Sequence, residues 1–398
     1  MIAAHYQIEA TIDDRAQTVS ADVVVTLPPK AVGHEAAFVI GDWMKLDAVD
    51  GGPGAKTHIE PVNAPLPHLN RIVFDFARAP TAPVRFHFHY AGPLIAPGSK
   101  PSIDPSQGME LGFEDAWVPV RPDFGLRFTV DADIRGVPAD EVVVAQGAVR
   151  HTGDRLTIHR AFDDMDMPVS ALTGLKEATG KDVEVYARDP NGQLETADRK
   201  DAARVIAYYS KLFGPLPADT LPIRLVVMPR PGGSFARRGF VSVGTGRAEE
   251  LKKLAHIDDW MLTITISHEF AHAWWRHGDP TTQDNWLNES FAEYASLRFT
   301  EAAYGEAALK ARLDPKIVAA KTAGPVIGHG RPSSRASYDK GPVLLFDLDH
   351  EIGRARMDAF LGRIGRHPPH TTAELIAALS EAEGPAVARK FEAALRAP

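Results

Sequence analysis

The sequence predicts an α+β protein, in which an all-β domain of sandwich or saddle shape precedes a mixed domain that ends in helices. The first part of the chain contains many short runs where apolar and polar residues alternate, as they do in half-buried strands. Beyond it, strand-like runs give way to apolar residues at helical spacing. At 398 residues the chain exceeds one ordinary domain. We therefore expect two domains, residues 1–172 and residues 173–398.

Short strands account for most of residues 5–165. Alternating or β-branched runs predict strands at 6–12, 23–25, 117–120, 128–130, 141–144 and 156–159. Two further runs, 72–76 and 84–90, flank a proline-rich turn and predict a β-hairpin with one buried face. Residues 93–107 are rich in Pro, Gly and Ser and predict a loop.

The second domain is expected to begin with strands and one helix. Residues 183–187 and 223–227 predict strands, and residues 197–213 predict an amphipathic helix. Residues 240–243 predict a strand at the edge of a sheet, where main-chain groups can pair with an extended peptide. A turn with two glycines precedes this strand and allows close approach of another backbone.

The remainder of the chain is predicted to be mainly helical. One helix spans residues 258–274 with Asp258 as its N-cap, and a second begins at Glu289, where apolar residues recur at helical spacing. Residues 316–335 predict an irregular segment. Further helices are predicted at 339–352, 359–364, 372–380 (with Thr371 as the N-cap) and 384–397.

A pair of histidines gives the clearest chemical signal. His268 and His272 are four residues apart, so both rings lie on one face of the predicted helix, about one turn apart. Both can reach one small cation, and a catalytic zinc site keeps three protein ligands and a water. Glu269 lies beside the pair, where it can take a proton from that water. The pattern predicts a zinc site with Glu269 as general base.

A third ligand is required, and Glu289 is the preferred residue. It lies seventeen positions after His272, at the start of the second helix, and two packed helices can bring it to the metal. His277 is disfavoured, because the metzincin pattern needs a glycine and a histidine at positions that here hold tryptophan and glycine. Glu293, one turn beyond Glu289, is an alternative ligand or a hydrogen-bonding partner of a ligand.

Composition excludes several other classes. The formal net charge of −8 argues against a nucleic-acid partner. The chain has no cysteine, so disulfides and thiolate ligands are excluded. No apolar run approaches the ~18 residues of a membrane span, and residues 1–5 do not resemble a signal peptide. We expect a cytoplasmic protein if the chain is complete, or a periplasmic or secreted one if a signal peptide was removed. Composition does not indicate the oligomeric state.

The order of three motifs resembles that of the gluzincin zinc aminopeptidases of the aminopeptidase N type. These motifs are the His268–His272 pattern, Trp-Leu-Asn-Glu ending at Glu289, and a Tyr-x-Lys-Gly stretch beginning at Tyr338. The resemblance implies a saddle-shaped N-terminal β domain followed by a thermolysin-like catalytic domain, in a short form that lacks the family's C-terminal helical domain. It also implies that Tyr338 stabilises the oxyanion of the tetrahedral intermediate.

This sequence departs from the family in the segment that would bind the substrate. The segment resembles the family's Gly-x-Met-Glu-Asn stretch, whose Glu grips the free amino terminus of a substrate; here Ala236 takes that place and two arginines follow it. The spacing between His272 and Glu289 is also two residues shorter than usual, which predicts a shorter loop. The expected substrate-binding residues are Gly232, Gly233, Ala236, Gly239 and Phe240.

Together these features predict a zinc metallopeptidase, a hydrolase that resembles an aminopeptidase and binds one Zn²⁺ per chain. His268, His272 and Glu289 would hold the metal, with Glu269 and Tyr338 catalytic. Because Ala236 removes the amine anchor, an endopeptidase or a hydrolase of small amides on the same zinc site remains an alternative. A peptide-binding module without catalysis is an alternative of another class.

Overall fold

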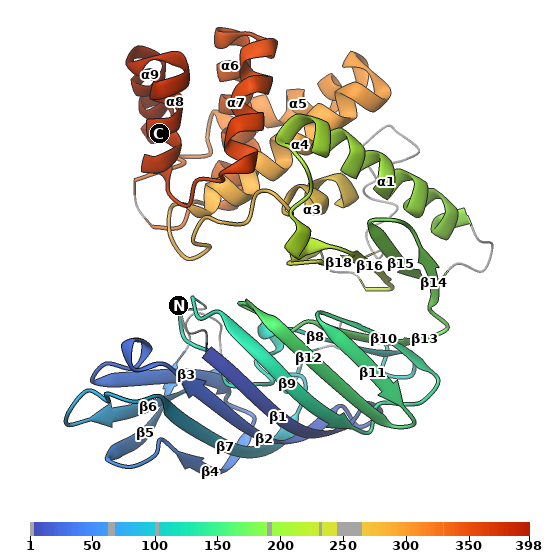
Figure 1. Ribbon diagram of the computed structural model, residues 1–398, viewed down its shortest axis with the longest axis vertical. Helices are drawn as coiled ribbons and strands as arrows, with labels where there is room; N and C mark the ends of the chain where they lie inside the picture. The colour runs from blue at the N-terminus through green and yellow to red at the C-terminus, as the bar shows by residue number, and fades with distance from the viewer. Residues whose placement is uncertain are drawn as a thin grey trace. The chain divides into compact units, whose positions relative to one another are not determined.

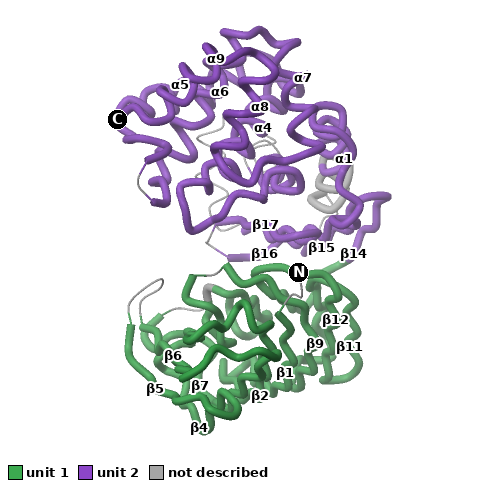
Figure 2. The backbone as a smooth tube through the Cα atoms, turned by 60° about the vertical axis from the view of Figure 1, so that its left-hand side comes forward, with its two compact units in different colours: residues 1–176 green, residues 177–398 purple. Residues whose placement is uncertain are grey.

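The computed structural model describes residues 4–62, 68–99, 103–123, 125–188, 193–230, 233–244, 265–328 and 330–398. The chain divides into two compact units, Met1–Lys176 and Glu177–Pro398 (Figure 2). The sequence-based boundary lies at residue 172. Strands dominate unit 1, whereas unit 2 combines one sheet with helices, so the predicted α+β class is confirmed.

Three sheets form the part of unit 1 that the structure describes. The largest has the strand order β11-β12-β9-β1-β2-β7-β4, and two three-stranded sheets have the orders β3-β6-β5 and β10-β13-β8. The strands are β1 (Ala4–Asp13), β2 (Thr18–Leu27), β3 (Glu35–Gly41), β4 (Lys45–Asp50), β5 (Ala55–Val62), β6 (Leu69–Phe76), β7 (Val84–Pro93), β8 (Gly108–Leu111), β9 (Phe128–Arg135), β10 (Glu141–Ala145), β11 (Ala148–Thr152), β12 (Arg155–Asp164) and β13 (Val169–Thr173). Short 3₁₀ turns occur at Pro29–Ala31 and Phe113–Asp115.

The two runs predicted as a hairpin are strands β6 and β7, but the hairpin prediction was wrong. β6 pairs with β3 and β5, whereas β7 pairs with β2 and β4. The buried faces of β6 and β7 meet across the core instead, with the rings of Phe74 and Phe86 4.8 Å apart. Alternating sequence cannot separate these arrangements, since a hairpin and two facing strands each bury every second residue.

Residues 117–120 were also predicted as a strand, and the structure contradicts this. Trp117, Val118 and Val120 are buried, but only an isolated bridge joins Val120 to Val39. The hydroxyls of two buried tyrosines donate hydrogen bonds to carbonyls of this segment, Tyr90 to Trp117 at 2.7 Å and Tyr6 to Pro119 at 2.9 Å. The two tyrosine hydroxyls therefore satisfy backbone carbonyls that would be paired with a neighbouring strand if this segment were part of a sheet.

One five-stranded sheet opens unit 2, with the order β14-β15-β16-β18-β17. β15, β16 and β18 are parallel, and β17 is antiparallel to β18. The predicted edge strand is β18, which lies between β16 and β17; the edge beside it is the three-residue β17. The strands are β14 (Lys176–Thr179), β15 (Val183–Ala187), β16 (Ile223–Met228), β17 (Phe235–Arg237) and β18 (Phe240–Gly244).

Helices make up the rest of the described part of unit 2 (Figure 1). They are α1 (Gln193–Phe213), α3 (Ser267–Ala271), α4 (Asn285–Tyr304), α5 (Glu306–Ala320), the π-helical turn η5 (Ala336–Lys340), α6 (Gly341–Ile352), α7 (Arg354–Arg366), α8 (Thr372–Glu383) and α9 (Pro385–Arg396), with a 3₁₀ turn at Ala218–Thr220. Thr371 caps α8 as predicted, because its side chain accepts a hydrogen bond from the Glu374 N–H. None of the helices in the described ranges has the length and hydropathy needed to cross a bilayer.

Several helix boundaries differ from prediction; α7, for example, spans Arg354–Arg366 rather than residues 359–364. α3 ends at Ala271 and a hydrogen-bonded turn follows it, so the helix does not continue to residue 274; Asp258, its predicted N-cap, lies outside the described residues. α4 begins at Asn285, before Glu289. α5 extends to Ala320, so the first residues of the segment predicted as irregular are helical.

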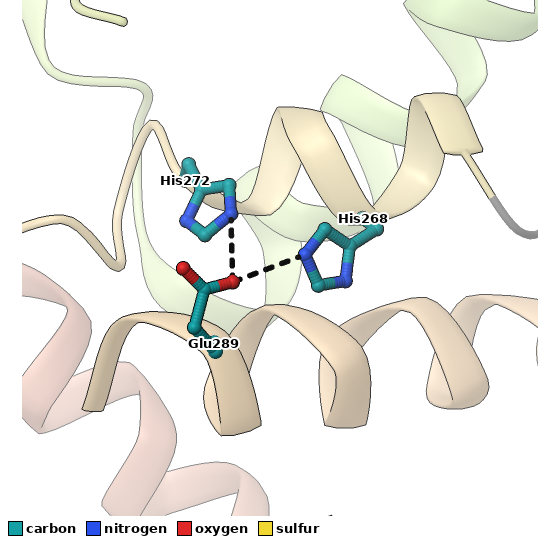
Figure 3. A group of neighbouring side chains, drawn as sticks. All are labelled: His268, His272 and Glu289. Atoms are coloured by element: carbon teal, nitrogen blue, oxygen red, sulfur yellow. Dashed lines mark ion pairs between the residues drawn. The ribbon is translucent and has the colours of Figure 1, made fainter. Parts of the chain in front are cut away.

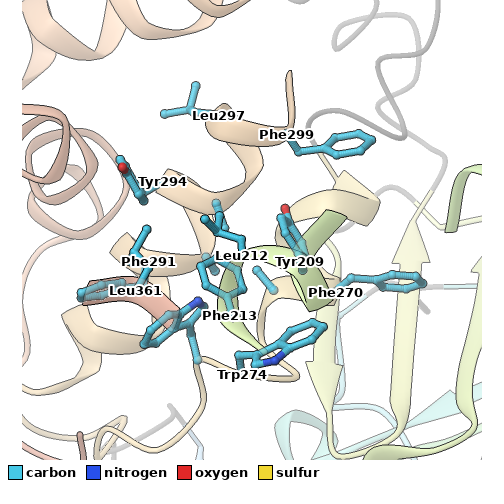
Figure 4. Packing of buried hydrophobic residues seen from close by; sticks show 14 of the residues in the cluster. Tyr209, Leu212, Phe213, Phe270, Trp274, Phe291, Tyr294, Leu297, Phe299 and Leu361 are labelled. Atoms are coloured by element: carbon cyan, nitrogen blue, oxygen red, sulfur yellow. The ribbon is translucent and has the colours of Figure 1, made fainter. Parts of the chain in front are cut away.

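Aromatic residues fill the core of unit 2 beneath the helices (Figure 4). Trp274 is fully buried, with its ring centroid 5.9 Å from that of Tyr209 on α1, and its indole N–H donates to the Gly214 carbonyl at 3.2 Å. Trp275 stacks on Phe291 of α4, at 4.5 Å between centroids. The residues that follow α3 are thus anchored on both sides, which fixes the position of α3 against α4.

Truncation of Phe38 tests the packing across the sheets of unit 1. Its buried ring lies 5.1 Å from Phe86 and 5.2 Å from Phe88, between centroids. Phe38→Ala should destabilise unit 1 by roughly 3–5 kcal/mol, since neighbouring strands cannot close the cavity. Thermal unfolding combined with hydrogen exchange should localise the loss to β3, β6 and β7. Ile59→Ala, at a site 46% exposed, is the control; equal effects of both changes would contradict this packing.

Candidate active site

His268 of α3, His272 directly after α3 and Glu289 of α4 converge on one point (Figure 3). Their potential ligand atoms all lie within 4.8 Å of one another. The Glu289 Oε2 atom is 3.5 Å from His268 Nε2 and 3.7 Å from His272 Nε2. Ligand atoms of a tetrahedral zinc lie about 3.4 Å apart when each is about 2.1 Å from the metal. The donor set and its spacing therefore fit a zinc ion.

Hydrogen bonds orient both histidine rings. His268 Nδ1 lies 3.0 Å from Glu293 Oε2, and His272 Nδ1 lies 2.9 Å from the carbonyl oxygen of Trp275. Each acceptor favours a proton on Nδ1, which leaves the lone pair on Nε2 for a metal. His272 follows the last residue of α3, so its acceptor, the Trp275 carbonyl, comes from the turn after the helix.

Glu293 is the centre of a buried ionic network. Its Oε1 atom is 3.0 Å from Arg312 Nη2 and 3.0 Å from Lys316 Nζ, both on α5. Burial alone would raise the pKa of Glu293, but the charges of Lys316 and Arg312 lower it well below its usual value. Glu293 thus stays ionised and supports His268, as one of the two alternatives drawn from the sequence expects; it is not among the clustered ligand atoms.

The electrostatics of the cluster favour a bound cation. Burial would lower the pKa of His268, but hydrogen bonds to Glu289 and Glu293 outweigh burial and raise it to about 10. In Glu289, burial is outweighed by the hydrogen bond from His268 and the charge of His272, and the pKa falls to about 2. Two ionised carboxylates next to His268 require a neighbouring positive charge. Either a proton on His268 or a divalent metal ion can provide it.

Glu269 lies on α3, between the two histidines in the sequence, and the charges of His268, His272 and Glu289 act on its carboxylate. Its carboxylate lines a recess together with Ala236 and Arg237 of β17. The side chain is 7% exposed, and burial raises its pKa against the opposing charges of His268 and His272. Among the described residues, no hydrogen bond or ion pair joins this carboxylate to another side chain, and the charges of His268, His272 and Arg237 offset part of the cost of its burial.

Tyr338 reaches the cluster from the π-helical turn η5. Its hydroxyl donates a hydrogen bond to Glu289 Oε2 at 2.7 Å, and its ring stacks on that of His268 with centroids 5.6 Å apart. Partial burial and the negative charge of Glu289 raise the pKa of Tyr338, which keeps the hydroxyl protonated. The Ser290 hydroxyl fixes the turn to α4 by donating to the Ser337 carbonyl at 2.6 Å.

The other expected site residues lie at or near the β17–β18 hairpin. Ala236 is in β17, and Gly239 forms the turn with a φ of +67°, a conformation that favours glycine. Phe240 is fully buried and lies between paired residues of β16 and β17, so the structure does not leave it available to a substrate. Gly233 precedes β17, and its carbonyl accepts a hydrogen bond from Arg230. Gly232 lies outside the described residues.

Asn288 and His277 do not join the cluster. The Asn288 side chain makes two hydrogen bonds of 2.9 Å to the backbone of Gly278, which hold the loop between α3 and α4 against the start of α4. His277 instead contacts His370, with ring centroids 5.2 Å apart. Asn288 therefore fixes the short connection that the spacing of the motif predicts.

No known family model matches the sequence. Solved structures nevertheless match it along almost its whole length. An M1 zinc metallopeptidase from Deinococcus radiodurans aligns with a TM-score of 0.69 at 18% identity, covering 99% of this chain and 94% of that one. A two-domain M1 zinc metallopeptidase bound to L-arginine aligns with a TM-score of 0.70 at 16% identity and the same coverage.

Leukotriene A4 hydrolase from Saccharomyces cerevisiae aligns with a TM-score of 0.73 at 16% identity, covering 99% of this chain and 67% of that one. This chain has the fold of the M1 zinc metallopeptidases. At these identities the likeness establishes the fold, and the chemistry has to be argued from the residues of this chain.

Sequence reasoning missed the two cations of the Glu293 network. Arg312 lies in α5, and Lys316 belongs to the segment predicted as irregular. Besides its contact with Glu293, Lys316 donates a hydrogen bond to the Tyr338 carbonyl at 2.9 Å. A helix predicted through residue 320 would have placed both on one face, since they are four residues apart.

Removal of the Glu293 carboxylate tests the network in metal-free protein. Glu293→Ala leaves Arg312 and Lys316 without their shared anion and should lower the free energy of unfolding by roughly 3–5 kcal/mol. Urea denaturation measures the change. The control is Glu301→Ala on the same helix, which removes an exposed pair with Arg354 and should cost less than about 1 kcal/mol. Similar small losses in both variants would show that the buried network does not stabilise the fold.

Proposed function

We propose that this protein is a zinc-dependent metallopeptidase of the aminopeptidase N type that hydrolyses peptide bonds. The observation that carries the proposal is the convergence of His268, His272 and Glu289, with Glu269 and Tyr338 beside them. The fold that this chain shares with the M1 zinc metallopeptidases also supports the proposal.

His268, His272 and Glu289 would hold the metal, and Glu293 would keep His268 in the required tautomer. Zinc in such a site polarises the scissile carbonyl and lowers the pKa of a water to about 7. A ligand set of two histidines and one glutamate is that of catalytic zinc in metallopeptidases, and it leaves a position open for water or substrate.

Glu269 is proposed to act as the general base. Its carboxylate takes a proton from the attacking water, and the resulting acid passes that proton to the leaving amine. The raised pKa suits this exchange, because a base with a pKa closer to neutrality also returns the proton readily. A buried carboxylate without a partner among the described residues has no evident structural role, which favours catalysis over a non-catalytic peptide-binding module.

Tyr338 is proposed to stabilise the oxyanion that forms on the substrate. Its protonated hydroxyl lies within 2.7 Å of Glu289 Oε2, at the edge of the proposed metal site. A donor in this position can transfer its hydrogen bond from Glu289 to a substrate oxygen as negative charge develops there. Lys316 and Ser290 hold the backbone of the turn that carries Tyr338, and so they position the hydroxyl.

The substrate is proposed to be a peptide or a small amide. In the described part of the sheet β17 is the edge strand, and such a strand can pair with an extended peptide, as edge strands do in other peptide-binding proteins. An exopeptidase would cleave only peptides with a free amino terminus, whereas an endopeptidase would be indifferent to acetylation. Mass spectrometry of cleavage products from paired free and acetylated peptides decides between the two.

Glu269→Gln separates catalysis from metal binding and from folding. The variant should retain one zinc per chain and lose roughly 10²–10⁴ in kcat, because the amide cannot accept the proton. Its melting temperature should be equal to that of the wild type or higher, since the removed buried charge has no hydrogen-bond or ion-pair partner among the described residues. Peptide cleavage assays, metal analysis and thermal unfolding measure the three quantities. Near wild-type turnover would exclude Glu269 as the base.

Tyr338→Phe tests the proposed oxyanion donor. The loss should appear in kcat, on the order of 10²–10³, with little change in KM, because the hydrogen bond forms fully only in the transition state. Tyr186→Phe is the matched control, as its hydroxyl also donates to a glutamate, Glu184, at 3.2 Å, but within the sheet. A change confined to KM in Tyr338→Phe would reject the oxyanion role.

A further inference from the structure

Lys340, the third residue of the Tyr-x-Lys-Gly stretch, has no part in the chemistry proposed above, yet it is almost fully buried. It ends the π-helical turn η5, two residues after Tyr338. Its ammonium group donates hydrogen bonds to the main-chain oxygen atoms of Gly324 at 2.9 Å, Ala397 at 2.6 Å and Pro398 at 3.0 Å. All three N–H donors of the ammonium are thus used, and these contacts offset the cost of burying the charge.

The acceptors of Lys340 belong to two segments that are far apart in the sequence and pair with each other in the fold. The backbone N–H groups of Val326 and Ile327 both donate to the Leu395 carbonyl, at 2.8 Å and 3.2 Å. These three side chains are buried in the core of unit 2. Lys340 therefore ties η5 to a packed structure made of residues 324–327 and of residues 395–398, which we call the C-terminal segment.

Gly341, the last residue of the same stretch, allows η5 to lie close to α4. A Cβ atom at this position would overlap the Ser290 hydroxyl and lie 2.6 Å from the Ser290 Cβ atom. That hydroxyl is the one that donates to the Ser337 carbonyl. The turn that carries Tyr338 is therefore held against α4 on one side, and Lys340 holds its last residue to the C-terminal segment.

The geometry of η5 decides where the Tyr338 hydroxyl lies. π-Helical turns are rare and occur mostly at functional sites, and the contacts around this one come from outside the turn. We propose that Lys340 is a positioning residue, which binds the C-terminal segment and thereby fixes η5 with the Tyr338 hydroxyl at the metal site. This inference rests on the function proposed above and specifies how the C-terminal segment contributes to that site.

A double-mutant cycle with Tyr338→Phe tests this role. Zinc-loaded Lys340→Met should lose roughly tenfold to a hundredfold in kcat with little change in KM, because a displacement of about 1 Å weakens a hydrogen bond that acts in the transition state. In the Tyr338→Phe background the same change should cost nothing further, since no hydroxyl remains to be misplaced. Losses that multiply in the double variant, or a wild-type kcat in Lys340→Met, would overturn the proposal.

The matched control is Lys390→Met, which removes an exposed lysine of α9 that pairs with Glu351. It should leave both kcat and KM unchanged. Metal analysis and thermal unfolding establish that each variant is zinc-loaded and folded at the assay temperature. A merely structural loss would lower activity in both the wild-type and the Tyr338→Phe background.

A shortened protein without Ala397 and Pro398 is the second variant. It keeps Lys340 but removes two of the three acceptors of the ammonium group. Its kcat should fall in the same direction as in Lys340→Met, again with no further effect in the Tyr338→Phe background. A wild-type kcat in the shortened protein would overturn the role of the C-terminal segment.

NMR spectra of the His268 ring report the position of Tyr338 without any reaction. The Tyr338 ring stacks on His268, so its ring current shifts the His268 resonances. In metal-free protein these resonances should move in Lys340→Met and stay in place in Lys390→Met; no movement in Lys340→Met would overturn the inference. Absence of peptide cleavage by the zinc-loaded wild type would instead overturn the proposed function, while the spectra still decide whether Lys340 fixes Tyr338.

Discussion

The buried carboxylate of Glu293 connects the three helices on which the candidate site depends. From α4 it accepts hydrogen bonds from His268 of α3 and from Arg312 and Lys316 of α5. Lys316 in turn holds the backbone of Tyr338. The orientation of a metal ligand and the position of the proposed oxyanion donor are therefore linked through one anion. Buried networks of this kind are stable only when every member is satisfied, which also makes them rigid.

The same network also concentrates negative charge at the site. Glu289 and Glu293 both stay ionised around His268, and Glu269 lies buried on the same helix as His268. A metal-free site must balance that charge with protons, as the raised pKa of His268 shows. A divalent cation would stabilise the fold through mass action, since it binds the folded site and not the unfolded chain. The buried carboxylates that the metal site needs lower the stability of the metal-free protein, and binding of the cation removes that cost.

The sequence indicated the ligands because helical geometry alone places His268 and His272 on one face, and the start of a second helix pointed to Glu289. The family resemblance supported Glu289 and supplied Tyr338. The partners of these residues were harder to predict. Arg312 and Lys316 look like ordinary surface cations until the length of α5 is known, and Pro315 is a residue that rarely occurs inside a helix. The edge strand β17 has only three residues, too few to show a period. The false hairpin of β6 and β7 arose because alternation reports which face is buried but not which strand is the neighbour.

The central claim is that these three side chains hold one zinc ion. Diffraction from crystals of the zinc-loaded protein, recorded on both sides of the zinc absorption edge, tests it directly. The account predicts one strong anomalous peak per chain, about 2.0–2.2 Å from His268 Nε2, His272 Nε2 and a Glu289 oxygen. It also predicts that Glu293 remains hydrogen-bonded to His268 Nδ1. A peak elsewhere, or none at this site in protein that retains stoichiometric zinc, would contradict the account.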